Sequence, residues 1–107
     1  MAATLQHNIT TVLTQNLLTS GDNVSDAKCI SIANVDSTNT AKVDLFLNKG
    51  ANNYYLLKNV EVPIETTLVL TKDDNISFNN TSSGFSLRIQ VDNGSTTAVP
   101  VDVMITK

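Results

Sequence analysis

The sequence predicts a single all-β domain: an antiparallel β-sandwich of about seven or eight strands, with an immunoglobulin-like or a jelly-roll-like order. Strand-like segments recur roughly every ten residues between turns, as a two-sheet sandwich requires. Hydrophobic residues make up 41% of the chain and charged residues 16%, while Thr and Val for strands and Asn and Ser for turns are abundant. The length of 107 residues suits one hydrophobic core.

The first twenty residues have the least regular pattern. Leu5, Ile9 and Leu13 are spaced by four, which fits a helix, but β-branched residues (Thr-Thr-Val) separate the last two and favour a strand. We therefore expect residues 1–20 to form an extended arm or a first strand, which pairs with a sheet or reaches a neighbouring molecule. Residues 21–107 are expected to form the sandwich.

The middle of the chain alternates between strand and turn residues. Turns are predicted at 36–40, 48–52 and 72–75. The expected strands are 28–35, 43–47, 54–57, 60–63, 67–70 and a short one at 76–78. Because one short turn separates 28–35 from 43–47, we expect these two strands to pair.

The clearest strand is residues 85–92, which place Phe85, Leu87, Ile89 and Val91 on one face. The Asn93-Gly94 pair that follows favours a tight hairpin turn, and residues 99–105 alternate again. Pro100 cannot donate a ladder hydrogen bond, so we expect this last strand to lie at an edge, where another subunit could add a strand, or to be paired on one side only at Pro100.

Composition excludes several classes of function. The formal net charge is −3 and the seven basic residues are spread singly, so nucleic acid is not an expected partner. No apolar run approaches membrane length and no secretory signal is visible, so no membrane contact is expected. Cys29 is the single cysteine, which excludes an intrachain disulfide and favours a reducing compartment.

Residues suited to catalysis are scarce. His7 is the single histidine, so a Cys–His pair would require it to meet Cys29, which lies in an alternating strand where a small core residue is expected. Glu61 and Glu65 are the only glutamates, but nothing aromatic accompanies them to bind sugar, so loop charges are expected instead of a glycosidase pair. We predict no enzymatic activity and no cofactor.

Two turns carry oxygen ligands of the kind that calcium prefers. Asp and Asn cluster at residues 22–26 and again at 73–75. The EF-hand loop, with its glycine and terminal glutamate, is absent. We therefore predict no metal site and expect these side chains to cap their own backbone, with calcium binding as the alternative.

Apolar residues also occur opposite the expected core faces. Phe46 and Val69 do so on their strands, and Met104 does so on the last one. Such residues indicate either a strand covered on both sides or a surface that a partner covers. The candidate interface residues are Leu5, Ile9, Leu13, Phe46, Val69, Pro100 and Met104.

Residues 53–70 join a Tyr-Tyr … Val-Glu-Val-Pro strand to a Thr-Thr-Leu-Val-Leu strand, and residues 85–89 add Phe-Ser-Leu-Arg-Ile. This combination resembles small β-sandwich virion proteins of tailed phages, especially phages of cyanobacteria and other marine bacteria. It covers roughly the middle half of the chain. Glu65 departs from the pattern, in which a glycine precedes the two threonines.

The resemblance implies a structural protein of the virion without catalytic residues: a capsid decoration or cement protein on the shell exterior, or a neck or tail component. Its expected partners are the major capsid protein or neck and tail proteins, together with further copies of itself as a homo-oligomer. Its expected location is the virion, assembled in the host bacterial cytoplasm. The alternative is a carbohydrate or cell-surface binding module, for which the sequence offers Tyr54 and Tyr55 but no tryptophan.

Overall fold

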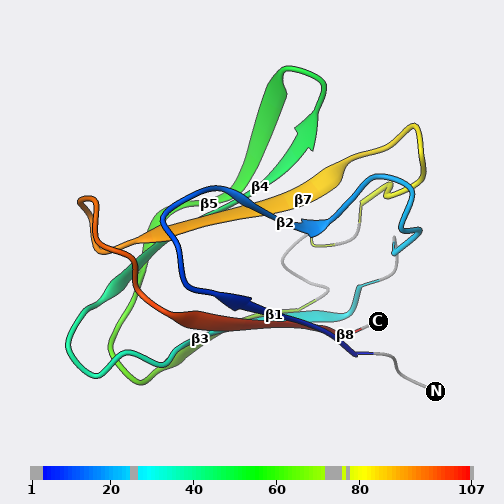
Figure 1. Ribbon diagram of the computed structural model, residues 1–107. Helices are drawn as coiled ribbons and strands as arrows, with labels where there is room; N and C mark the ends of the chain where they lie inside the picture. Colours follow the sequence, from blue (N-terminus) through cyan, green and yellow to red (C-terminus); the bar gives the residue numbers. More distant parts are fainter. Residues whose placement is uncertain (1–3, 25–26, 72–75, 77, 107) are drawn as a thin grey trace.

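A computed structural model describes residues 4–24, 27–71, 76 and 78–106. These residues form two four-stranded antiparallel sheets that pack face to face (Figure 1). We call the sheet with order β1-β8-β3-β6 sheet A and the sheet with order β2-β7-β4-β5 sheet B. The strands are β1 (Thr4–Ile9), β2 (Gln15–Leu18), β3 (Cys29–Asn34), β4 (Ala41–Lys49), β5 (Asn52–Val62), β6 (Thr67–Thr71), β7 (Ser86–Asp92) and β8 (Val101–Thr106). The predicted all-β sandwich is confirmed.

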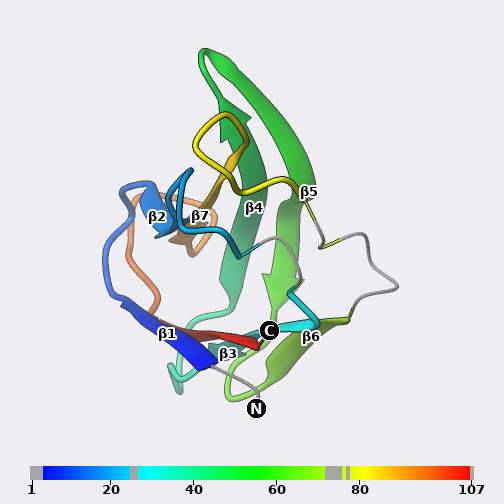
Figure 2. The same cartoon turned by 90° about the vertical axis from the view of Figure 1, so that its right-hand side faces the viewer.

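The strand order is that of a jelly roll. β1 pairs with β8, β2 with β7, β3 with β6 and β4 with β5, so the chain resembles one long hairpin rolled up into two sheets. Of the two orders that the sequence allowed, this excludes the immunoglobulin-like one. Figure 2 shows the two sheets side by side, with the β4–β5 hairpin projecting beyond them.

The core lies between the inner faces of the two sheets. The predicted alternation is confirmed in β7 and β8, whose inward side chains are fully buried. They are Leu87, Ile89 and Val91 from β7 and Val101, Val103 and Ile105 from β8. Burying each such side chain contributes about 1.5–3 kcal/mol, and the adjacent polar positions are left on the outer faces.

Two predicted strand pairings are wrong. The chain bends at Gly94, with a φ of 92° and a hydrogen bond from Asn93 N to Thr97 O (3.1 Å), but the predicted tight turn is absent, because Asn93 does not have a positive φ. The bend leads from β7 in sheet B to β8 in sheet A. Likewise β3 and β4 lie in different sheets, and β3 pairs with β6 and β8. Alternation identifies the buried face of a strand, but it does not identify the neighbouring strand.

The last strand is not an edge, which corrects another prediction. β8 lies between β1 and β3. Pro100 precedes the first residue of β8, so no ladder donor is lost, and its carbonyl accepts a hydrogen bond from Val35 N (3.2 Å).

The segment 1–20 contributes strands to both sheets, so residues 4–9 and 15–18 do not form an arm that leaves the domain. Ile9 is 3% exposed and belongs to the core. The short strand predicted at 76–78 is absent at Ile76 and Phe78, and Ser77 lies outside the described residues. Ile76 is nevertheless fully buried.

A buried asparagine fixes the loops at one end of the sandwich. The side-chain oxygen of Asn80 accepts a hydrogen bond from Val24 N (3.0 Å), and its amide nitrogen donates to Thr19 O (3.1 Å) and Phe85 O (2.9 Å). The backbone oxygen of Asn80 accepts from Gly21 N (3.0 Å). The β2–β3 and β6–β7 connections are therefore joined by buried, satisfied polar groups.

A second buried asparagine, Asn34, has the same role for the β3–β4 and β5–β6 connections. Its amide nitrogen donates to Asn39 O (2.9 Å) and Val62 O (3.0 Å), and its side-chain oxygen accepts from Asp36 N (2.9 Å). Its backbone N–H donates to Thr66 O (2.9 Å).

The β5–β6 turn holds Glu65 in the left-handed region, with a φ of 56°. Both the N–H and the hydroxyl of Thr66 donate to Pro63 O, at 3.3 and 2.7 Å. A positive φ at the third of four residues is typical of a type II turn, in which glycine is preferred. The glycine of the resembling pattern therefore corresponds to a real conformational requirement at this position.

Candidate interaction surface

The outward side chains of sheet A form cross-strand rows, which together we call the sheet A face. One row runs Gln6–Met104–Ser31–Val69 across β1, β8, β3 and β6. The next row runs Asn8–Asp102–Ala33–Thr67. Residues two apart on a strand share a face, so these rows are neighbours on the surface.

This face carries exposed apolar groups and little charge. Val69 is 50% and Met104 46% exposed, and they lie on either side of Ser31 on the central strand. Among the described residues of the four strands, Asp102 is the only charged side chain; it accepts a hydrogen bond from Asn8 Nδ2 (2.6 Å). The result is a largely uncharged surface with two exposed apolar side chains and a low centre, because the outward residues of β3 are small.

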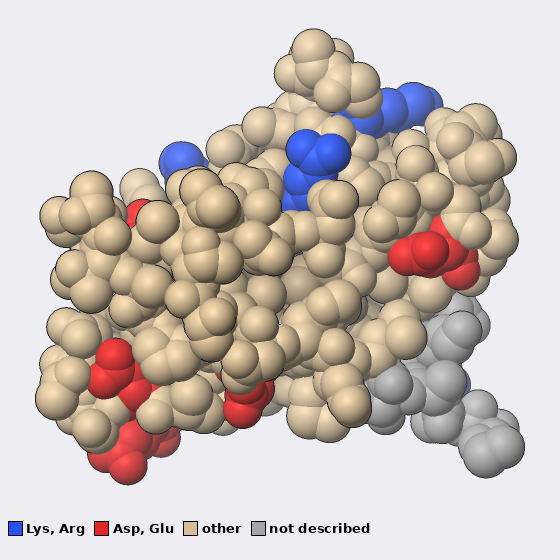
Figure 3. Space-filling model, in the orientation of Figure 1, with Lys and Arg blue, Asp and Glu red and all other residues tan. Residues whose placement is uncertain are grey.

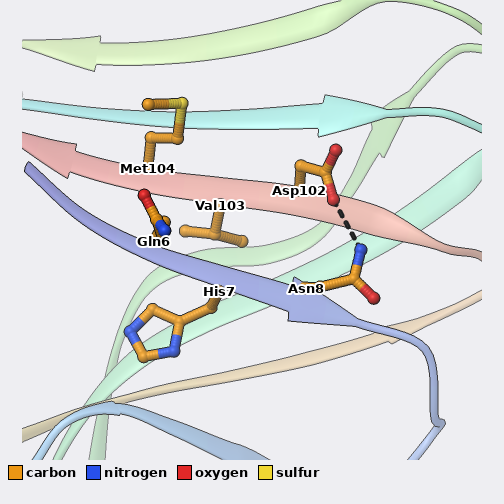
Figure 4. Close-up of a pocket in the computed structure, with 6 residues that line it drawn as sticks. All are labelled: Gln6, His7, Asn8, Asp102, Val103 and Met104. Atoms are coloured by element: carbon orange, nitrogen blue, oxygen red, sulfur yellow. Dashed lines mark hydrogen bonds between the residues drawn. The ribbon is translucent and has the colours of Figure 1, made fainter.

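A cavity of about 440 Å³ opens over β1 and β8 (Figure 4). Gln6 and Met104 stand at one end, the hydrogen-bonded Asn8 and Asp102 at the other, and the His7–Val103 pair lies between these rows. In Figure 4 the His7 ring points away from Met104, toward the other side of the sheet. The cavity therefore belongs to the sheet A face.

A second cavity, of about 390 Å³, lies where β1 faces β2 across the open side of the sandwich. Its apolar floor includes the buried Leu17, Leu18 and Val24, and His7 and Asp22 are among its polar lining residues. Both cavities therefore border β1, one on each side of the strand.

The predicted interface residues fall into two groups. Val69 and Met104 both lie on the sheet A face, and Leu13 is 67% exposed in the β1–β2 loop. The others are less accessible: Leu5 packs against the core, Pro100 is half-buried, and Ile9 and Phe46 are buried. Ile9 and Phe46 are therefore wrong as surface candidates.

Phe46 does point away from the core, as predicted, but its own sheet covers it. It pairs with Arg88 and Tyr55, and its ring lies 5.0 Å from the Tyr55 ring, which leaves Phe46 5% exposed. Lys58 Nζ lies 4.7 Å above the Tyr55 ring and 3.3 Å from Asp44 Oδ2. The hydrogen bond and charge of Asp44 raise the pKa of Lys58.

Several other outward positions of sheet B are charged. Lys42 lies opposite Glu61 on β5 and Asp92 on β7. Arg88 Nε is buried and has no hydrogen-bond partner. Opposite charges thus lie in adjacent strands of this face, and Lys58 and Asp44 form an ion pair on it.

The two tyrosines do not form one aromatic platform. Tyr54 and Tyr55 are adjacent in β5 and so point to opposite faces. Tyr54 packs edge-on against Phe85 at 5.8 Å, whereas Tyr55 packs on Phe46. This arrangement does not favour the carbohydrate-binding alternative.

The residues considered for catalysis are far from one another in the sheet. His7 pairs with the buried Val103, whereas Cys29 pairs with Thr106, so the two side chains lie on opposite faces of sheet A. Cys29 is half-buried on the outer face, which corrects its expected core position. Glu61 and Glu65 are both exposed.

No group of three metal-ligating side chains occurs within the described part of the chain. Asp22 Oδ2 accepts a hydrogen bond from Thr19 N (2.8 Å), as expected of a residue that caps a turn. Asn23 Nδ2 likewise donates to Gly21 O (3.0 Å) within the same turn. The remaining residues of the calcium alternative, Asp26 and 73–75, lie outside the described residues.

Sequence reasoning missed Gln6, Asn8, Ser31 and Asp102 as parts of the surface. Alternation in β8 does place Asp102 beside Met104, so that signal was present. The contributions of β1 and β3 depend on register between strands far apart in the chain, which alternation does not supply.

No protein-family model, curated protein or solved structure matches this chain. Within the described ranges, no helix is long and apolar enough to cross a membrane.

Proposed function

We propose that this chain is a structural protein of a tailed-phage virion, which decorates or cements the capsid exterior through the sheet A face. The observation that carries the proposal is the sheet A face itself, where Val69 and Met104 are about half exposed and Asp102 is the charged residue. A weakly charged surface with exposed apolar side chains suits burial against another protein.

The virion assignment is supported by the resemblance of residues 53–70 and 85–89 to small phage virion proteins. The left-handed conformation of Glu65 agrees with the glycine of that pattern. Jelly rolls are also common in viral capsid domains, although this support is analogy between folds.

A cement protein acts through many weak contacts repeated over a shell. Each contact can be small, because simultaneous engagement of many copies raises the overall affinity. The sheet A face fits this role, since its outward residues stand on hydrogen-bonded strands and lose little conformational freedom on binding. The major capsid protein is the proposed partner, and a neck or tail protein is the second candidate.

The test uses purified phage shells that lack the protein. Wild-type protein should cosediment with the shells and raise their disruption temperature. The Val69→Lys/Met104→Lys double variant should lose at least about tenfold in affinity, because two charges would be buried without partners. Asn52→Lys, at the exposed tip of the β4–β5 hairpin, adds the same kind of charge elsewhere and should bind like wild type.

Failure of the wild-type protein to bind capsid, neck or tail assemblies would reject the proposal. Saturable binding to a glycan array, without binding to particles, would replace it with the carbohydrate-binding alternative.

A further inference from the structure

The free edge of β1 differs from the other three sheet edges. β2 has four residues and an irregular register against β7, and β6 has five residues. β5 carries Lys58 and Glu61 and has irregular register against β4. Short strands, irregularities and charges are the usual means by which proteins protect an edge from further pairing.

β1 has none of these protections. It runs for six residues with unbroken register against β8, and its sequence Thr-Leu-Gln-His-Asn-Ile contains no Asp, Glu, Lys, Arg, Pro or Gly. Because β1 is the outermost strand of sheet A, alternate N–H and C=O groups along it point away from β8. The edge is therefore open to another extended strand of about the same length.

The surroundings of β1 also suit an added strand. One cavity borders it on the sheet A face and the other borders it between the sheets. Side chains of an added strand would alternate between these two sides, as in other cases of strand addition. Figure 3 shows that charged side chains on this side of the molecule are few and lie around a broad uncharged middle.

We propose that β1 pairs with β1 of a second copy of this chain, antiparallel and about a two-fold axis, to join two copies of sheet A into one continuous sheet. An axis perpendicular to the sheet at His7 places Leu5 of one copy opposite Ile9 of the other on the inner side. It places Gln6 opposite Asn8 on the outer side. On the outer side amides thus meet amides, whereas on the inner side Leu5 and Ile9 keep their contacts with the core of their own chain.

A second copy fits better than an unrelated partner for two reasons. The edge carries no formal charge that would select a complementary partner, and a chain with net charge −3 associates with itself best where charge is absent. A two-fold axis also makes each contact occur twice, so one self-complementary strand is sufficient.

This pairing does not depend on the proposed virion role. It uses the edge of β1 and leaves Val69, on the opposite edge strand, exposed for another partner. The absence of dimerisation would therefore leave the shell-binding proposal standing, and the absence of shell binding would leave the dimer proposal standing.

The test is self-association of the full chain, measured by sedimentation velocity over a range of concentrations. Wild type should dimerise, whereas Gln6→Lys and Gln6→Glu should each weaken dimerisation by about 3- to 10-fold, because the two introduced charges of like sign lie diagonally across the two-fold axis, within reach of each other. Thr67→Lys adds a charge on the same face at the opposite edge of sheet A and should dimerise like wild type.

Mixing Gln6→Lys with Gln6→Glu should restore association as a heterodimer, detected by native mass spectrometry. Thermal unfolding of each variant establishes that it is folded. A wild type that stays monomeric at its highest soluble concentration overturns the proposal. So does equal weakening by Thr67→Lys, or a mixture that fails to form the heterodimer.

Discussion

The two outer faces of the sandwich differ in how many charged residues they carry and in how well their apolar side chains are covered. The strands of sheet B contain Lys42, Asp44, Lys49, Lys58, Glu61, Arg88 and Asp92, whereas the described strands of sheet A contain Asp102 alone. On sheet B, Phe46 lies under the Tyr55 ring. On sheet A, Val69 and Met104 have no comparable cover.

The difference indicates that the requirements of folding alone do not explain which residues lie on the sheet A face. Both sheets bury equivalent aliphatic residues inward, so either outer face could have carried charges without loss of the core. Sheet B uses its outer positions for contacts within the chain. Sheet A leaves them available, as expected of a surface that meets a partner.

The largest expected effect lies on sheet B. Phe46→Ala should lower the free energy of unfolding by about 3 kcal/mol, because it removes a buried ring and its contact with Tyr55. Urea denaturation measures this change, and shell binding should be unaltered under native conditions. A loss below about 0.5 kcal/mol would mean that Phe46 is more exposed in solution than in this structure.

Ser31→Arg on sheet A should weaken shell binding and leave folding stability nearly unchanged, which is the opposite of what we expect for Phe46→Ala. It places a long charged side chain between Met104 and Val69, so we expect about tenfold weaker shell binding with folding stability changed by less than about 1 kcal/mol. Ser31→Thr keeps a small polar group and serves as the matched control. Equal binding by both variants would place the contact elsewhere.

Glu65→Gly tests the turn that leads from sheet B to sheet A. Glycine relieves the left-handed strain but adds flexibility to the unfolded chain, so we expect a net stabilisation of about 0.5–1 kcal/mol. The melting temperature should rise accordingly. Ile64→Gly, one residue earlier and without a positive φ, should be destabilising.

The smallest effect concerns Lys58. Because the pKa of Lys58 is raised in the folded state, its contribution to stability is complete below its ordinary pKa of 10.5 and is lost as the pH rises through the higher folded value. Lys58 is exposed, so the change is small and screened by salt. Unfolding measured between about pH 10 and 12 should show a weaker pH dependence for Lys58→Gln than for wild type.

Local sequence patterns predicted which face of a strand is buried better than they predicted which strands pair with one another. The alternation of Leu87, Ile89 and Val91 correctly gave the core face of β7, because burial of alternate residues is a property of the strand alone. The bend at Asn93-Gly94 was identified, yet the tight turn and the hairpin were wrong, because β7 and β8 each find two better neighbours far away in the chain.

The candidate surface was predicted in part for the same reason. Val69 and Met104 were identified from their own strands, but Ser31, which lies between them, required the register of three strands. The prediction that Ile9 lies at an interface was wrong, because a spacing of four does not distinguish an arm from a strand whose last residue points inward. The sequence did not indicate a buried Asn80, because its burial depends on loops that meet only in the folded molecule.

The pairing of β1 with β8 has a consequence for synthesis of the protein. Thr4 pairs with Thr106, so β1 cannot pair with β8 until the roughly one hundred residues between them have been synthesised. Contacts between such distant parts of a chain make folding slow, on the order of milliseconds to seconds. During that time β1 and β3 expose aliphatic strand faces, and the nascent chain depends on chaperones or dilution to avoid aggregation.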